Sequence, residues 1–546
     1  MKIAFVIIKS MLKYILGLRL KHLAESAMTE MSIQIAHDCY RTGNYDQAAT
    51  ICQTLLASSP RDHHSLNLLA MIAIKRRDYP QGICFLDQSI AAVPNQAQAL
   101  FNRGYAKNQL RNFDNAIKDL QRATQLKKDY ANAHFELAKA LASLHRFDQA
   151  ITEYNEVLRI QANHVEALNN KGNLLKRLDR TLEALACYDD AIALRPDFAE
   201  AHNNRGKALK DLGRFQEALD AYDQAIAHRP DYAMALTNKS LLLLLLGEMS
   251  SGWALFEWRW QSSKANKKRT FDKPLWLGKQ AIAAKRLLIW GEQGFGDLIQ
   301  FSRFLPLLEK LGCLPIIEVP ATLIPLLETL AVPCEIIEKG CKPSADFDYH
   351  CPLMSLPLAL DITLNSIPPP ASFQIPADRK TKWHEILGEK KRPRIGLAWS
   401  GSPTHGNDRN RSLSLRQLAP LFSLPAEIHS LQKEIRADDL TFLSTVPIFR
   451  HEQDIADFAD TAALVAEMDL VVSVDTSVAH LAGSIGKETW ILLPFVPDYR
   501  WLLNQEDSPW YPAVRLFRQP AQNDWPTAIS SLLSAFATRQ NQGSSN

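Results

Sequence analysis

"LLIWGEQGFGDLIQF" occupies residues 287–301 and joins a short apolar run to a glycine-rich turn that ends in an aspartate, Asp297. An apolar run of this length predicts a buried β-strand, and the periodic residues after the turn predict a helix. The three glycines of the turn are Gly291, Gly294 and Gly296. A strand, a turn and a helix in this order begin a βαβ unit, so the stretch predicts an α/β domain.

Apolar runs alternate with helical stretches from residue 285 onward, which is typical of parallel βαβ units. We expect two doubly wound, Rossmann-like halves at 285–375 and 394–535, joined by a linker at 376–393. The expected strands are Arg286–Trp290, Pro315–Val319, Glu335–Glu338, Asp348–Leu353, Arg394–Trp399, Glu427–Leu431, Pro447–Arg450, Leu470–Val474 and Trp490–Leu493. Ligands of such sheets bind beyond the carboxyl ends of the strands.

A period of 34 residues fills the first half of the chain. Prolines recur in one phase, at Pro60, Pro94, Pro196 and Pro230, and small and aromatic residues recur in others. The pattern predicts stacked pairs of antiparallel helices, because one pair alone cannot bury its apolar face. It resembles the tetratricopeptide repeat, with six full copies and one degenerate copy over 29–260. A capping segment at 1–28, a linker at 261–284 and a disordered tail at 536–546 complete the expected organisation.

The composition limits the classes of partner. The chain has 546 residues and a formal net charge of +3, which gives no indication of nucleic acid binding. Its eight cysteines are scattered without zinc-type spacing, which indicates reduced thiols, no metal site and a cytoplasmic protein. Membrane contact is expected only through residues 1–20, whose basic amphipathic pattern fits either capping of the repeats or binding to anionic lipid.

Another strand end carries polar residues in the stretch "DLVVSVDTSVAHLAGSIGK", residues 469–487. The apolar strand stops at Asp475, Thr476 and Ser477, and the helix that follows carries His480 one turn in. Free N–H groups at a helix start favour a diphosphate, so these four residues are candidate ligands of one. A plain capped helix after a core strand is the alternative interpretation.

Two further strand ends have candidate residues for an anion. Ser400 and Gly401 follow one strand, and Arg411 lies in the polar loop beyond them. A guanidinium binds oxyanions bidentately, which makes Arg411 the best candidate for a phosphate ligand. Gln432 and Lys433 follow the next strand and are expected at the same edge of the sheet. A solvated basic loop is the alternative interpretation of the segment that carries Arg411.

Together, these segments resemble the GT-B glycosyltransferases, and within them the heptosyltransferase family (family nine). The resemblance to that family depends on the turn "GEQGFGD" (291–297) and on "VSVDTSVAHLAG" (472–483). The stretch "LLPFVPDYRWLL" (492–503) resembles the ends of a bacterial group of repeat proteins that finish in a family-nine-like domain. Repeats followed by a GT-B module are also similar to the domain pairing of O-GlcNAc transferase. The resemblance implies metal-independent transfer from a nucleotide-diphosphate sugar, with no cofactor, and implies that Asp297 is the general base. It also implies that the segment from Asp475 to His480 holds the diphosphate.

The turn is longer than is usual in that family, and the extra Glu292 is a rival to Asp297 for the role of base. The residues that read the nucleotide are not identified, so ADP-heptose-like and UDP- or GDP-hexose donors stay open. A lipopolysaccharide acceptor and a protein acceptor also stay open.

Asparagines recur at one position of the repeats, at Asn102, Asn170, Asn204 and Asn238, with Glu136 between the first two. An asparagine ladder on the first helix of each pair can hydrogen-bond the backbone of an extended peptide, so the repeats are expected to bind a protein or peptide acceptor. The alternative is that asparagine is simply common at this position of the repeat and has no role in binding.

The expected function is a glycosyltransferase whose repeats recruit the acceptor. The alternative is a non-enzymatic scaffold with an inert nucleotide-binding module. A dinucleotide-dependent oxidoreductase does not fit, because "GEQGFGD" departs from the GxGxxG pattern.

Overall fold

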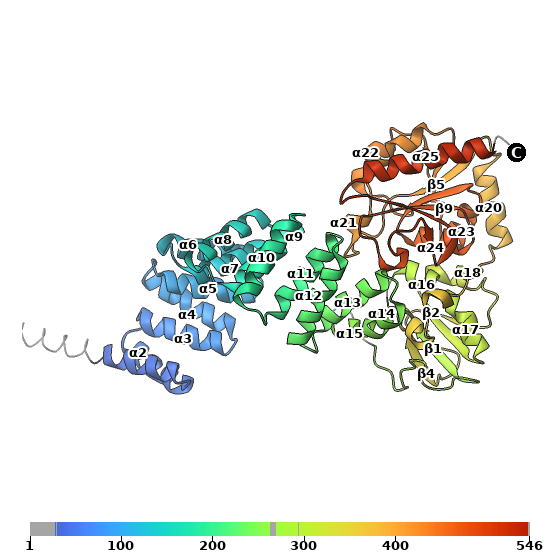
Figure 1. The fold of residues 1–546 in the computed structure, drawn as a ribbon. Coiled ribbons are helices and arrows are strands. Elements are labelled where there is room, and N and C mark those ends of the chain that lie inside the picture. Colours follow the sequence, from blue (N-terminus) through green and yellow to red (C-terminus); the bar gives the residue numbers. More distant parts are fainter. Residues whose placement is uncertain (1–27, 29, 263–268, 293, 544–546) are drawn as a thin grey trace, which may run out of the picture. The chain divides into compact units, whose positions relative to one another are not determined.

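A computed structural model describes residue 28 and residues 30–262, 269–292 and 294–543. The chain divides into two compact units, with the boundary between Ala208 and Leu209 (Figure 1). The predicted segment at 1–28 lies almost wholly outside the described residues. Among the helices that are described, none is long and apolar enough to cross a membrane.

The first unit consists of helical hairpins that repeat every 34 residues. Helical residues 30–41 precede α2 (Tyr45–Ser58), α3 (His63–Lys75), α4 (Tyr79–Ala92), α5 (Ala97–Gln109), α6 (Phe113–Leu126), α7 (Ala131–Ser143), α8 (Phe147–Ile160), α9 (Val165–Arg177), α10 (Thr181–Leu194) and α11 (Ala199–Asp211). A Cβ on Gly104 would lie 2.6 Å from Cγ of Leu120, and one on Gly172 would lie 2.6 Å from the ring of Tyr188. The recurring small residues therefore permit the close helix packing that the period predicts.

The second unit begins with the end of the repeats. Its first helices are α12 (Phe215–His228), α13 (Ala233–Leu245), α14 (Met249–Phe256) and α15 (Arg259–Ser262). The degenerate copy still packs as a hairpin, since the Ser240 hydroxyl donates to the Gly252 carbonyl over 2.8 Å. The second helix of this copy has only eight residues, and the short α15 follows it.

A four-stranded parallel sheet follows, with strand order β3-β2-β1-β4. Its strands are β1 (Arg286–Trp290), β2 (Leu314–Val319), β3 (Glu335–Glu338) and β4 (Tyr349–Pro352), and its helices are α16 (Phe295–Phe301), α17 (Leu305–Lys310), α18 (Ile324–Leu327) and α19 (Leu356–Ala359). The four strands agree with the predicted ones to within a residue at each end. The turn after β1 leads directly into α16, as expected.

A second sheet has seven strands in the order β10-β11-β9-β8-β5-β6-β7, and all pairs except β10–β11 are parallel. Its strands are β5 (Arg394–Ala398), β6 (Glu427–Ser430), β7 (Ile448–Phe449), β8 (Leu470–Val474), β9 (Thr489–Leu493), β10 (Asp507–Ser508) and β11 (Tyr511–Arg518). Its helices are α20 (Ala377–Leu387), α21 (Asp408–Arg411), α22 (Ala437–Leu443), α23 (Phe458–Ala466), α24 (Ser477–Ser484) and α25 (Trp525–Gly543). Figure 1 shows α25 on one face of the sheet and α23 and α24 on the other. Sequence reasoning missed β10 and β11.

Three connecting segments differ from expectation because each buries large apolar side chains. Trp276, in the predicted linker 261–284, is 2% exposed, and its backbone N–H donates to the backbone carbonyl of His350 in β4. Trp383, in the predicted linker 376–393, is fully buried in α20. Phe536 is 1% exposed in α25, so the predicted disordered tail is helical as far as Gly543. Burial of these rings outweighs the polar composition around them.

Candidate functional site

The starts of α16 and α24 meet where the two sheets face each other. Each helix follows the carboxyl end of a strand, β1 in the first sheet and β8 in the second. A Cβ on Gly296 would lie 2.8 Å from Cδ2 of His480 and 3.5 Å from the Cα of Ser477. The glycine therefore permits the backbone of one helix start to contact the other, and it brings together two of the predicted segments.

Asp297 lies at this meeting point, in the first turn of α16. Its Oδ2 accepts the N–H of Gly294 over 2.9 Å, and its Oδ1 forms an ion pair with Nη2 of Arg500. Burial raises the pKa of Asp297, and the Arg500 guanidinium partly offsets this. Both carboxylate oxygens are therefore engaged, one by the turn and one by a cation.

Arg500 is the centre of the charged cluster, and sequence reasoning did not assign it a role. It comes from a short 3-10 helix at Tyr499–Trp501, after β9. Besides Asp297, its guanidinium donates to Oε1 of Gln300 over 2.6 Å and to Oδ1 of Asp498 over 2.7 Å. The residue is 7% exposed. The only signal in the sequence was the motif "LLPFVPDYRWLL", which carried a resemblance without a chemical role.

Asp475 and His480 lie together on the α24 side. Nε2 of His480 is 3.7 Å from Oδ1 of Asp475, and its Nδ1 is 3.0 Å from the hydroxyl of Tyr511. The imidazole also stacks on Trp501, with ring centroids 5.4 Å apart. Burial raises the pKa of Asp475 to about 6 and lowers the pKa of His480, so burial disfavours the charged form of each.

Thr476 and Ser477 form the start of α24. Thr476 has extended backbone, and its hydroxyl lies 3.1 Å from that of Ser473 instead of capping the helix. Ser477 is the first helical residue and is partly exposed. The helix start is thus oriented as the sequence predicts, at the carboxyl end of a buried strand.

Arg411 reaches the same place from the loop after β5. Its Nη1 donates to the backbone carbonyl of Asp475 over 2.9 Å, while its Nε is buried without a hydrogen-bond partner. Gly401 permits this approach, because a Cβ there would lie 2.6 Å from Nη2 of Arg411. A buried donor without a partner costs free energy, and an anionic ligand would remove that cost.

Ser400, Gln432 and Lys433 are engaged within the second sheet. The Gln432 side chain accepts the N–H groups of Trp399 and Ser400 and donates to the Ser400 hydroxyl over 3.0 Å. The ammonium of Lys433 donates to the carbonyls of Glu452 and Ile455, over 2.9 and 2.5 Å. These contacts join the ends of neighbouring strands, so the three side chains hold loops in place in this structure.

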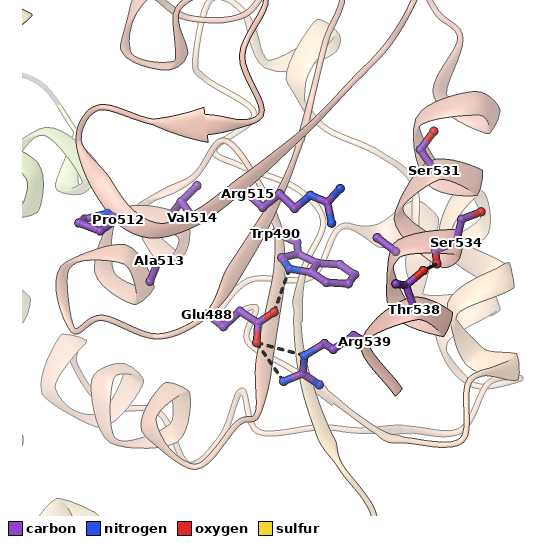
Figure 2. A pocket seen from close by; sticks show the side chains of 11 residues that line it. Glu488, Trp490, Pro512, Ala513, Val514, Arg515, Ser531, Ser534, Thr538 and Arg539 are labelled. Atoms are coloured by element: carbon purple, nitrogen blue, oxygen red, sulfur yellow. Dashed lines mark hydrogen bonds and ion pairs between the residues drawn. The ribbon is translucent and has the colours of Figure 1, made fainter. Parts of the chain in front are cut away.

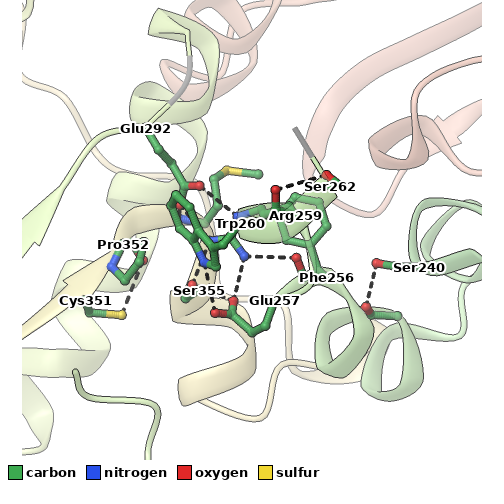
Figure 3. Close-up of polar contacts among 12 residues, drawn as sticks. Ser240, Phe256, Glu257, Arg259, Trp260, Ser262, Glu292, Cys351, Pro352 and Ser355 are labelled. Atoms are coloured by element: carbon green, nitrogen blue, oxygen red, sulfur yellow. Dashed lines mark hydrogen bonds and ion pairs between the residues drawn. The ribbon is translucent and has the colours of Figure 1, made fainter. Parts of the chain in front are cut away.

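Glu292 follows β1 in the same turn as Asp297 but has different partners. Its carboxylate receives two hydrogen bonds of 2.8 Å from Arg259 of α15 and one of 3.3 Å from the N–H of Met354 (Figure 3). Arg259 also donates to Glu257 and to the Ser355 hydroxyl, and it is 2% exposed. Burial raises the pKa of Glu292. The residue joins the last repeat to the first sheet.

The four asparagines of the predicted ladder lie on α5, α9, α11 and α13. Asn102 is 8% exposed, and its carbonyl accepts from Gln98 over 3.2 Å while its amide nitrogen is buried without a partner. Asn204 donates to Asn169 over 2.9 Å, and Asn170 and Asn238 are partly exposed. The buried amide group of Asn102 therefore has unused hydrogen-bonding capacity.

Two cavities lie at the opposite, amino edge of the second sheet. The larger, of about 780 Å³, is bounded by β9, β11 and α25 (Figure 2). In it, Glu488 pairs with Arg539 at 3.0 Å and accepts from Trp490. The smaller cavity, of about 330 Å³, is lined by residues before β5 and β8, including Lys390 and Asp469. Parallel sheets bind ligands at the carboxyl edge, so we place the candidate site at the charged cluster.

Metal ligands are not grouped in the part of the chain that the structure describes, where no three His, Cys, Asp or Glu side chains are arranged to hold an ion.

Models of the tetratricopeptide repeat match residues 33–97, 109–172, 181–213 and 199–232. The N-terminal part consists of tetratricopeptide repeats. Among curated proteins, Protein FlbA of Caulobacter vibrioides is 27% identical over 321 residues, which are 54% of this chain and 53% of that protein. The chain thus spans about half the length of the curated relative it matches.

Several solved structures are similar to part of the chain. One is YrrB, described as a TPR protein with an unusual peptide-binding site, at 19% identity over 35% of this chain and 98% of that chain, with a TM-score of 0.32. Another is MamA, at 19% identity over 30% and 96%, with a TM-score of 0.29. A third is pilF of Pseudomonas aeruginosa, at 17% identity over 38% and 94%, with a TM-score of 0.35.

Proposed function

We propose that the second unit contains a GT-B glycosyltransferase module that moves a sugar from a nucleotide-diphosphate donor to an acceptor hydroxyl. The observation that carries the proposal is the contact between Gly296 and His480. It joins the helix start that carries Asp297 to the helix start that carries Asp475, at the edges of two parallel sheets. A base from one sheet and an anion site from the other are what transfer from a nucleotide sugar requires.

Asp297 is the general base in this proposal. Its carboxylate accepts the proton of the acceptor hydroxyl as that oxygen forms a bond to the anomeric carbon of the sugar. The bond between that carbon and the phosphate oxygen breaks, and its electron pair leaves with the nucleoside diphosphate. The raised pKa of Asp297 favours the role, since a more basic carboxylate accepts a proton more readily.

Asp297 is a better base than Glu292 for a geometric reason. Both carboxylates are engaged at both oxygens, but the cation that binds Glu292 is Arg259 of α15, at the end of the repeats. Asp297 is paired with Arg500, and it follows Gly296, which contacts the start of α24 where the leaving diphosphate would lie. We therefore assign Glu292 the role of holding the turn in place.

The donor's diphosphate is assigned to the start of α24, beside Arg411. The uncapped helix start supplies N–H groups, and Arg411 supplies a guanidinium whose Nε has no partner. These groups stabilise the charge of the leaving diphosphate without a metal ion. The donor is a substrate, and no cofactor is required. The cysteine usage favours a cytoplasmic location, where nucleotide sugars are available to the enzyme.

The repeats are proposed to recruit a protein or peptide acceptor. Unused amide capacity at Asn102 supports this, because an extended peptide backbone offers matching carbonyls. YrrB, a structural neighbour of the repeats, is described as having a peptide-binding site. A glycan acceptor remains the other outcome of the test below.

The proposal is tested by incubating the full chain with radiolabelled nucleotide sugars and cell lysate, and by scoring label on protein and on lipid. Transfer by the wild type that is lost in Asp297→Asn supports the proposal. Absence of transfer with every donor argues for the second candidate, a scaffold whose α/β module is catalytically inert. The observation that favours the scaffold is the Asp297–Arg500 ion pair, which occupies the proposed base. A thermal-shift assay with UDP, ADP, GDP and CDP then shows whether the inert module still binds a nucleotide or binds none.

A further inference from the structure

Asp297 is not free to accept a proton while Arg500 donates to it. Its Oδ1 is paired with the guanidinium, and its Oδ2 holds the N–H of Gly294. A neighbouring cation lowers the affinity of a carboxylate for a proton. In Asp297 burial outweighs this effect, so what the ion pair limits is access: an acceptor hydroxyl can reach Oδ1 when the guanidinium moves to another anion.

The segment that carries Arg500 packs directly against the proposed diphosphate site. Trp501, the next residue, stacks on His480 in the first turns of α24, and that same imidazole lies against Gly296. Arg500 thus pairs with the carboxylate on α16, while its neighbour Trp501 packs against α24. Asp475 and Arg500 also interact electrostatically, although each is buried.

A diphosphate is a stronger partner for a guanidinium than one carboxylate is. It carries more negative charge, and it offers pairs of oxygens that match the planar fork of arginine. Arg500 also binds Asp498 through Nη1 and Gln300 through Nε, and the guanidinium is rigid and planar. These two contacts therefore change together with the one to Asp297 when the guanidinium turns to a diphosphate.

Building on the proposed transferase function, we propose that Asp297 and the donor's diphosphate compete for Arg500, so that donor binding releases the base. Arg500 then stabilises the diphosphate, and the released Asp297 accepts the proton of the acceptor hydroxyl. The acceptor is activated only when the donor is bound. This order ties proton removal to the presence of the sugar that is to be transferred.

The competition has a consequence that binding alone can measure. Replacing Asp297 by asparagine removes the negative charge that holds Arg500, so a nucleoside diphosphate should bind more tightly to Asp297→Asn, by about 5-fold. The gain depends on Arg500, and it should disappear when Arg500→Gln is combined with Asp297→Asn. Arg500→Gln alone should weaken binding by about 10-fold, since it removes a charged hydrogen bond to the diphosphate.

The experiment is calorimetric titration of the full chain with UDP, ADP, GDP and CDP for the wild type, both single variants and the double variant. Arg500→Lys is a second variant in case Arg500→Gln does not fold, because lysine keeps the positive charge. In a chain that carries Arg500→Lys, Asp297→Asn should still increase nucleotide affinity, but by less than in the wild type. Glu335→Gln is the matched control, because Glu335 pairs with Arg286 at the edge of the first sheet. It should leave nucleotide affinity unchanged.

The outcomes separate this inference from the proposed function. If no nucleotide binds any variant, the donor site itself is refuted and the competition with it. If a nucleotide binds the wild type but Asp297→Asn binds no more tightly, the competition alone is refuted. A gain that persists in the Arg500→Gln background also refutes it, because the gain then has another cause. A gain confined to chains that keep the arginine or lysine supports it.

Discussion

Arg259 donates from Nε and Nη2 to the two oxygens of Glu292, both over 2.8 Å, and both side chains are at least nine-tenths buried. The pair spans 33 residues of sequence and joins the short helix α15 to the turn after β1. The turn that carries Asp297 is therefore anchored on the last repeat. This contact gives the degenerate seventh copy a structural role in the α/β region.

Loss of one partner of this pair should destabilise the second unit strongly. Arg259→Gln should cost roughly 3–5 kcal/mol of unfolding free energy, because the buried carboxylate of Glu292 loses its charged partner. Glu292→Gln should cost less than Arg259→Gln, because Arg259 keeps its ion pair with Glu257. All 11 tryptophans lie at or beyond position 253, so tryptophan fluorescence during urea unfolding reports the second unit alone. Glu335→Gln is the control, since that side chain is 24% exposed, and it should cost about 0–1 kcal/mol. Equal effects of the two glutamate variants would contradict the prediction.

Asp297→Asn should reduce sugar transfer by at least about 100-fold, because the amide cannot accept the acceptor's proton. The measurement is the initial rate of label transfer under saturating donor, and the urea midpoint shows whether the variant is folded. Retention of wild-type turnover would remove Asp297 from the mechanism and return Glu292 to consideration.

Gly296→Ala should separate the starts of α16 and α24, because its Cβ would lie 2.8 Å from Cδ2 of His480. Transfer should fall by about 10-fold or more, since a small displacement of reacting groups has a large effect on rate. Gly406→Ala is the matched control, because a Cβ there meets no atom within 4 Å. The rates of both variants are compared with wild type, and equal rates would argue that the contact has no part in catalysis.

Stability should depend on pH through Asp475, whose pKa burial raises to about 6. The folded protein keeps a proton there that the unfolded chain releases near pH 4. The resulting stability is therefore present below about pH 4 and is lost as the pH rises through 6, on the order of 2–3 kcal/mol. Asp475→Asn cannot ionise and should lose less stability between pH 4 and 7. Urea midpoints at four pH values test this, and parallel curves for the two proteins would contradict it.

The elements that local pattern controls could be predicted. The helix pairs could be predicted because small residues such as Gly104 and Gly172, which permit close packing within each repeat, recur every 34 residues. Nine strands of the two sheets could be predicted, most of them from short apolar runs, which parallel strands buried on both faces favour. β11 was missed because its burial alternates along the strand, and this pattern is weaker than a continuous apolar run. Trp276 and Trp383 lie in predicted linkers because the residues around them are mostly polar, and the sequence pattern gave no indication that the two rings are buried.

The sequence by itself determined the repeats, the parallel strands and the chemical types at the strand ends, including Asp297, Asp475 and His480. Those features depend on residues near one another in the chain. The tertiary structure alone decided which side chains share a partner: Arg500 reaches Asp297 across 203 residues, and Arg259 engages the rival Glu292. Ion pairs at such separations leave no local pattern, because their partners meet only when the two sheets and the last repeat pack together.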